Sequence, residues 1–166
     1  MKCLYIQNKF TNIEESIAKA KTTVTDPAIA AMLSGYLIVY ISGVYEDCIE
    51  HLFIQRARKN NDVELEGFIK SAINVQFRNP RFEKIQNLLG WLNPAYKIEM
   101  SKRVEQTNIA AINSIVENKD CIAHGKTFSN ATINDISTYY SNAKKIFEVL
   151  DDIILRFATT CPCSQP

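Results

Sequence analysis

The stretch that decides the fold is "AIAAMLSGYLIVYISGVY", residues 28–45, which contains no charged residue. It follows Asp26 and Pro27, a pair typical of a helix start, and it continues without a break into "EDCIEHLFIQRARKNN", residues 46–61. Apolar residues recur through both parts at spacings of three and four, as on the core-facing side of a helix. They are Leu33, Leu37, Tyr40, Ile41, Val44, Cys48 and Leu52. The pattern predicts a long central helix of an all-α bundle.

The uncharged stretch also has the minimum length of a membrane-spanning helix. Its three tyrosines, two serines and two glycines, together with the charged continuation at the same periodicity, favour a long helix of a soluble protein instead. We therefore expect no membrane partner. The lack of charge in residues 28–45 indicates burial on more than one side, as in a bundle helix that also contacts a partner subunit.

The remaining chain also has helical periodicity, and no run alternates apolar and polar residues as a strand would. Five further helices are predicted. The first starts at Thr11, with Glu14 in capping-box spacing, and the second covers residues 62–77. The third runs from Asn79 and Pro80 to a stop at Gly90, the fourth covers residues 107–124, and the fifth starts at Thr132 with Asp135. We expect one all-α domain over residues 1–158, a bundle with long central antiparallel helices. Residues 159–166 are predicted to be a flexible tail, in which Cys161 and Cys163 are more typical of disorder than of a metal site.

Composition narrows the class of protein. The net charge of +1 gives no global basic field, so binding of RNA would depend on a local patch. The five cysteines are odd in number and scattered, which favours reduced thiols in a cytoplasmic protein over a disulfide framework. The sequence has no glycine-rich phosphate loop, no dinucleotide fingerprint and no cysteine pairs with zinc spacing. We expect no cofactor and no metal.

The two histidines have different surroundings. His51 follows Glu50 directly and lies four residues after Asp47, which favours a packing or surface histidine over a metal ligand. The other histidine stands in "NKDCIAHGKT", residues 118–127. An ordinary helix end explains much of that segment, because His and Lys suit the negative end of the helix dipole and Gly125 suits the position after a helix.

Three features of this segment favour a site as well. Lys119 interrupts the apolar line of its predicted helix, Asp120 and His124 fall on one face, and Lys126 adds a second cation beside His124. An imidazole can move a proton, a neighbouring carboxylate can orient it, and an ammonium can stabilise charge on a phosphoryl group. These residue types are suited to phosphate chemistry without a metal.

The segment "KDCIAHG" resembles the R-N-x-I-A-H-G motif of HEPN domains, most closely the RiboL-PSP-HEPN type. The order of helices is similar too, with one long helix before the motif and a long amphipathic helix after it. The resemblance implies a HEPN-like helical bundle that forms a homodimer with the motif helices facing one another. It also implies a metal-independent endoribonuclease acting on single-stranded or loop RNA. Such proteins serve as toxins or effectors of antiviral defence, with an antitoxin or regulatory protein as a further partner.

The resemblance also assigns roles at the motif. His124 matches the family histidine that activates the ribose hydroxyl or protonates the leaving oxygen, and Asp120 matches the polar position beside the family arginine. Lys119 stands where the family has that arginine, and Lys126 and Asn118 are expected substrate contacts. Lysine keeps the charge but lacks the planar fork that grips two phosphate oxygens. A non-catalytic dimer that binds RNA, a nucleotide or a partner protein therefore stays open as the alternative.

Helical geometry gives the dimer a role in the site. Lys119 and His124 are five residues apart, so on a straight helix they diverge by roughly 140°. Two antiparallel helices across a two-fold axis would let each lysine reach the histidine of the other subunit.

A basic region with aromatic residues is the expected RNA-binding surface. Its members are Arg78, Arg81, Lys84, Lys97, Lys102 and Arg103, interleaved with Phe82, Trp91 and Tyr96. Such a surface can follow a phosphate backbone and stack unpaired bases. Amphipathic helices that expose their cations and bury their aromatic rings explain the same residues, and this is the more common situation.

Overall fold

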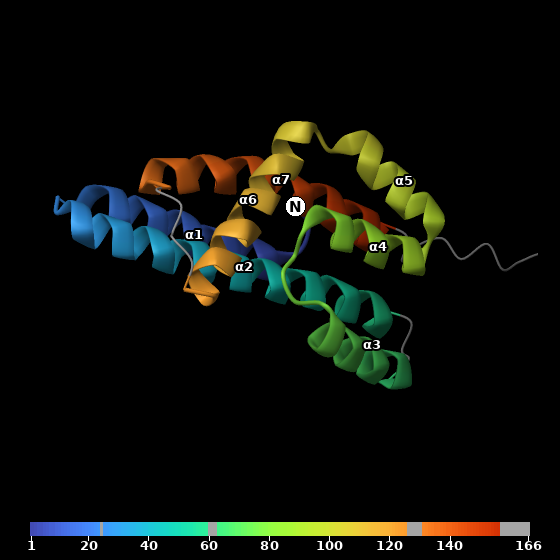
Figure 1. Ribbon diagram of the computed structural model, residues 1–166. Coiled ribbons are helices and arrows are strands. Elements are labelled where there is room, and N and C mark those ends of the chain that lie inside the picture. Colours follow the sequence, from blue (N-terminus) through green and yellow to red (C-terminus); the bar gives the residue numbers. More distant parts are fainter. Residues whose placement is uncertain (24, 60–62, 126–130, 157–166) are drawn as a thin grey trace, which may run out of the picture.

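The computed structural model describes residues 1–23, 25–59, 63–125 and 131–156. Those residues form seven helices and no strand (Figure 1). The helices are α1 Leu4–Thr23, α2 Pro27–Arg58, α3 Val63–Gln76, α4 Phe82–Leu92, α5 Pro94–Arg103, α6 Gln106–Ala123 and α7 Ile133–Arg156. The predicted all-α class is confirmed.

The three longest of the described helices, α1, α2 and α7, run along the bundle. α1 runs antiparallel to α7, because Cys3 N–H donates to Asp151 at the end of α7 while Lys21 donates to Ser137 near its start. α2 packs against both of them, and α6 crosses the bundle on α2 and α7 (Figure 1). α4 and α5 form a helical hairpin, and α3 folds back on α2. This arrangement brings the end of α6 onto the middle of α2.

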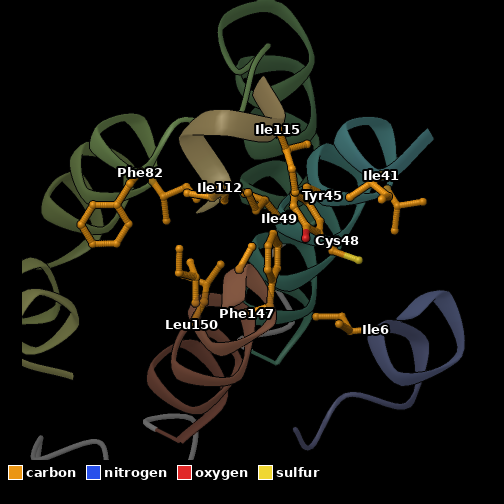
Figure 2. Close-up of a cluster of buried hydrophobic side chains, with 14 of the residues drawn as sticks. Ile6, Ile41, Tyr45, Cys48, Ile49, Phe82, Ile112, Ile115, Phe147 and Leu150 are labelled. Atoms are coloured by element: carbon orange, nitrogen blue, oxygen red, sulfur yellow. The ribbon is translucent and has the colours of Figure 1, made fainter. Parts of the chain in front are cut away.

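The core lies where α1, α2, α6 and α7 meet. In Figure 2 the rings of Tyr45 from α2 and Phe147 from α7 lie side by side, with their centroids 4.5 Å apart. Ile6 of α1 and Ile115 of α6 are fully buried in the same cluster. The apolar line of α7 faces this core, since its described members are all buried: Ile136, Tyr140, Ala143, Phe147, Leu150 and Ile154.

Among the described helices, α2 alone has the length and composition of a membrane span. Its uncharged part contains the buried residues Leu37, Ile38, Ile41 and Tyr45, and the helix contacts α1, α3, α6 and α7. These contacts are those of a central bundle helix, as the sequence predicts. The Asp26 cap is also confirmed, because its carboxylate accepts the N–H groups of residues 28 and 29.

Two predicted helix starts are wrong. α1 begins at Leu4 and not at Thr11, whose hydroxyl donates to the carbonyl of Gln7 one turn earlier inside the helix. α4 begins at Phe82, because Asn79 adopts a left-handed φ of 65° that no helical residue has. The reciprocal bonds between Thr132 and Asp135 at the start of α7 confirm that cap.

The end predicted at Gly90 is also wrong, and one helix is missed. α4 continues through Gly90 to Leu92, and the helix α5 that follows was not predicted. A Cβ on Gly90 would lie 3.3 Å from the Lys97 side chain, so this glycine allows α4 and α5 to pack closely rather than ending a helix. The predicted tail, with Cys161 and Cys163, lies outside the described residues.

Candidate active site at the end of helix α6

His124 stands directly after the last residue of α6. Its N–H donates to the carbonyl of Asp120 at 3.1 Å, so the backbone continues the helical pattern up to the histidine. Gly125 then takes a φ of 60°, and its N–H donates to Ile122. This left-handed glycine ends the helix as the sequence predicts. The imidazole of His124 is exposed at this end.

One face of α6 carries three polar residues in a row. Glu117, Asp120 and His124 follow one another at spacings of three and four, which places them along one side of the helix. Arg81, just before α4, spans the first two: its guanidinium lies 3.3 Å from Glu117 Oε1 and 3.4 Å from Asp120 Oδ2. A cation from another element therefore lies one turn from His124.

Lys119 points to a different neighbour. Its ammonium donates to Glu46 Oε1 on α2 at 3.2 Å and to Asn79 Oδ1 at 2.5 Å. On α6 it is one residue from Asp120, a rotation of about 100°, and about 140° from His124. The structure therefore brings Asp120 and His124 to one face and places Lys119 on another.

The turn that carries Arg81 is held to two helices. Glu46 Oε1 also accepts the N–H of Asn79 at 3.0 Å, and Phe82 N–H donates to Asn113 Oδ1 on α6 at 3.1 Å. Glu46 belongs to α2, so the turn is fixed on both of its sides. Arg81 lies between these two anchors.

A family model described as RiboL-PSP-HEPN matches residues 5–156. The chain belongs to the RiboL-PSP-HEPN family. The match extends through α1 to α7 and includes the motif segment, so it confirms the family that the sequence resembles. Comparisons with curated proteins and with solved structures gave no match.

Two further motif residues of this RiboL-PSP-HEPN chain were expected to contact substrate. Asn118 is buried, with 8% of its surface exposed, and its amide donates to the carbonyl of Ser114 at 2.8 Å. This burial leaves little of the side chain open to a substrate. Lys126 lies outside the described residues.

The expected RNA-binding surface is reduced by the structure. Phe82 and Tyr96 are buried in the hydrophobic core, which contradicts their use as stacking platforms for bases. Trp91 is 74% exposed and lies beside an apolar groove of about 440 Å³ between α3 and α4, where Phe68 and Lys84 also line the wall. Arg103 is engaged by Glu99 and Asp152, each at 2.8 Å.

His51 has a packing role. Its ring stacks on Tyr5 with the centroids 4.0 Å apart, and burial lowers the pKa of its imidazole. Asp47, its neighbour one turn earlier, accepts hydrogen bonds from Tyr5 and Lys9. In the part of the chain that the structure describes, no three His, Cys, Asp or Glu side chains gather as a metal site would need.

Sequence reasoning missed the contacts of Arg81, Glu46 and Asn79 around the motif. Arg81 was assigned only to the basic surface, and Asn79 only to a helix cap. The Asn-Pro-Arg sequence of residues 79–81 is a turn signal, since asparagine tolerates positive φ and proline restricts the residue before it. A turn there could have been read from the sequence, but its contact with α6 could not.

Proposed function

We propose that this RiboL-PSP-HEPN protein is a metal-independent endoribonuclease. The observation that carries the proposal is the exposed imidazole of His124, one turn after the Asp120 carboxylate at the glycine-terminated end of α6. An exposed imidazole can reach a substrate that binds on the protein surface. Imidazole is also the side chain best suited to moving protons near neutral pH.

His124 removes the proton from a ribose 2′-hydroxyl in this mechanism. The freed oxygen attacks the adjacent phosphorus and the bond to the 5′-oxygen breaks, which leaves a 2′,3′-cyclic phosphate on one fragment. The departing 5′-oxygen takes a proton from water and becomes a hydroxyl on the other fragment, and the proton held by His124 returns to water. A cation beside the phosphate stabilises the charge that develops during the attack.

The proposed active form is a homodimer with a composite site in which the two α6 helices face each other. Its support is a line of exposed residues on α2 at spacings of three and four: Ile29, Met32, Tyr36, Val39 and Gly43. The next member of the line is Glu46, which binds Lys119 of α6. An exposed apolar stripe that ends where Glu46 of α2 contacts α6 suits a second copy of the chain.

The test is cleavage of single-stranded and loop-containing RNA in the presence of EDTA, with wild type beside His124→Ala. The substituted side chain is exposed, so the variant should unfold at the same denaturant concentration as wild type. Cleavage by wild type that disappears in the variant supports the proposal. Equal RNA loss with both proteins would defeat it.

A role as a toxin or antiviral defence effector is the proposed biological setting, with an antitoxin or regulatory protein as partner. Expression in cells should then arrest growth, and His124→Ala should relieve the arrest. Growth that is unaffected by wild-type expression would contradict this role.

One observation favours the second candidate, a non-catalytic dimer that binds RNA, a nucleotide or a partner protein. The motif cation Lys119 is engaged by Glu46 and Asn79 and does not point to the face of His124. Retention of labelled RNA without any cleavage, unchanged in His124→Ala, would support this candidate over the enzyme.

A further inference from the structure

Among the described residues, Arg81 is a cation that contacts the face of α6 on which His124 lies. The guanidinium lies against Glu117 and Asp120, and His124 is the next residue on the same side of α6. Asp120 and His124 are four positions apart, which is a rise of about 6 Å along the helix axis. Because Asp120 is contacted by the guanidinium, Arg81 lies about one helical turn from the position of His124.

We propose that Arg81 binds the scissile phosphate beside His124 of the same subunit, in the role that the motif arginine would have at position 119. Each of the two facing α6 helices then brings its own pair of cation and imidazole to the composite site proposed above. The inference rests on the ribonuclease function proposed above, and it names a residue outside the motif. It also removes the geometric problem of the motif, since Lys119 and His124 diverge on α6 whereas Arg81 approaches the face of His124 from another element.

The guanidinium retains donors for a phosphate. Its two contacts are single, one from each terminal nitrogen, and at 3.3 and 3.4 Å they are long for charged hydrogen bonds. The side chain is 42% exposed. Guanidinium has five N–H groups, so a phosphate can be bound by those that do not face the carboxylates. The chain therefore offers at Arg81 the planar fork that Lys119 lacks.

In this arrangement the Asp120 carboxylate positions the Arg81 guanidinium. A carboxylate beside a phosphate would repel it, but here Asp120 lies against the positive charge of Arg81. The carboxylate can hold the guanidinium at the face of α6 while the paired charge reduces repulsion of the substrate. Asp120 is thus a positioning residue for Arg81.

The backbone around Arg81 is fixed in a way that an ordinary surface arginine does not need. Asn79 is bound by Glu46 and Lys119, and Phe82 N–H is bound by Asn113. These contacts hold the residues on both sides of Arg81 against α2 and α6. A fixed backbone reduces the entropy lost when a long side chain binds a substrate.

The first experiment compares Arg81→Ala and Arg81→Lys with Arg58→Ala in steady-state RNA cleavage. Arg58 is a matched control, since it also forms an exposed ion pair, with Glu66. It lies at the C-terminal end of α2, away from the exposed apolar stripe. We expect Arg81→Ala to lower kcat by about 100-fold or more, with a smaller change in KM, because the contact strengthens as charge develops on the phosphate. Arg81→Lys should recover part of the loss, and Arg58→Ala should match wild type.

The outcomes separate this inference from the proposed function. Wild-type kcat in Arg81→Ala, with His124→Ala inactive, would overturn the role of Arg81 and leave the ribonuclease intact. Equal RNA loss by wild type and His124→Ala would instead defeat the ribonuclease itself. A phosphate contact would also be overturned if Arg81→Ala and Arg81→Lys lost equal amounts of kcat and both unfolded more easily than wild type. The loss would then follow from stability and not from the charge.

Mixing of subunits tests the assignment to one subunit. Arg81→Ala and His124→Ala chains are unfolded together, refolded and assayed beside each variant alone. If both residues act within one subunit, every site in the mixture lacks one of them and no cleavage returns. Recovery of cleavage in the mixture would overturn the assignment, because it requires Arg81 of one subunit to act with His124 of the other.

Discussion

The ammonium of Lys119 lies 2.5 Å from Oδ1 of Asn79, a residue with a left-handed φ of 65°. Glu46 binds both partners, through the Lys119 ammonium at 3.2 Å and the Asn79 N–H at 3.0 Å. The motif position thus joins α6 to α2 and to the turn before α4. Lysine suits this place because a compact ammonium can reach two oxygens on different elements.

Replacing Lys119 by methionine should lower the free energy of unfolding by about 1–2 kcal/mol, because charged hydrogen bonds are lost from a partly exposed site. Methionine keeps most of the apolar length of the side chain, so the loss reports on the ammonium. Urea denaturation followed by circular dichroism measures it. Lys145→Met on α7 is the control, since its exposed pair with Glu148 at 3.5 Å should contribute less than about 0.5 kcal/mol. Equal losses in both variants would contradict a structural role for Lys119.

Restoring the family arginine with Lys119→Arg should not raise RNA cleavage above wild type. The larger guanidinium remains on the side of α6 that faces Glu46, about 140° from His124. We expect kcat at or below the wild-type value in the same steady-state assay. A rise of tenfold or more would mean that position 119 does grip the phosphate, as the motif alone suggests.

The long helices were predictable from sequence because their apolar periodicity extends over many turns. The line through Leu37 of α2 points into the core as expected, and the apolar line through Phe147 of α7 does the same. Boundaries were less predictable where one residue type has two uses. Thr11 has the spacing of a cap but lies inside α1, and Gly90 has the composition of a stop but allows α5 to approach α4.

The candidate site was predictable only along α6. Asp120 and His124 share a face by helical spacing alone, and Gly125 was expected to end the helix. The contacts that Arg81 and Glu46 make with α6 depend on the packing of three elements, and one sequence carries no signal for them. Lys119 is an example, since the sequence shows its charge but not that its side chain points to Glu46 and Asn79.

Substitution of Asn79 should separate backbone strain from the lost amide contact. Asn79→Gly and Asn79→Ala both remove the oxygen that binds Lys119, but alanine must also adopt a positive φ. We expect alanine to be less stable than glycine by about 1 kcal/mol in urea denaturation. If the glycine variant were the less stable of the two, the left-handed conformation of this residue would be wrong.

The acid stability of the bundle should depend in part on Glu14 of α1. The hydrogen bond from the Lys144 ammonium, 2.7 Å away, lowers the pKa of this carboxyl below its ordinary value of 4.5, burial opposes the shift, and the Tyr140 hydroxyl adds to it. A lowered folded-state pKa stabilises the protein above the ordinary pKa, and this part is lost as the pH falls through the lowered value. Glu14→Gln should therefore be less stable than wild type near pH 7, with a gap that closes below about pH 4.5.

The size of that gap should stay below about 1 kcal/mol, because the Glu14 side chain is 48% exposed and water screens the pair. Lys144→Met should remove the same pH-dependent part from the other partner. Urea denaturation between pH 3 and pH 8 measures both variants. A gap that is constant down to pH 3 would show that Glu14 contributes through packing and not through its charge.

Trp91 should be the aromatic residue of the basic surface that affects RNA binding. Phe82 and Tyr96 are buried, whereas Trp91 is exposed and lines the same groove as Lys84. If the protein binds single-stranded RNA, stacking of one base on the indole contributes about 1–3 kcal/mol, so Trp91→Ala should raise Kd by about 5-fold to 150-fold. Trp91→Phe should keep much of the affinity.

Fluorescence anisotropy with labelled RNA, in a His124→Ala background, measures Kd without cleavage. Leu4→Ala is the control, because Leu4 is an exposed apolar residue of α1. Equal Kd values for Trp91→Ala and Leu4→Ala would exclude Trp91 from the RNA-binding surface.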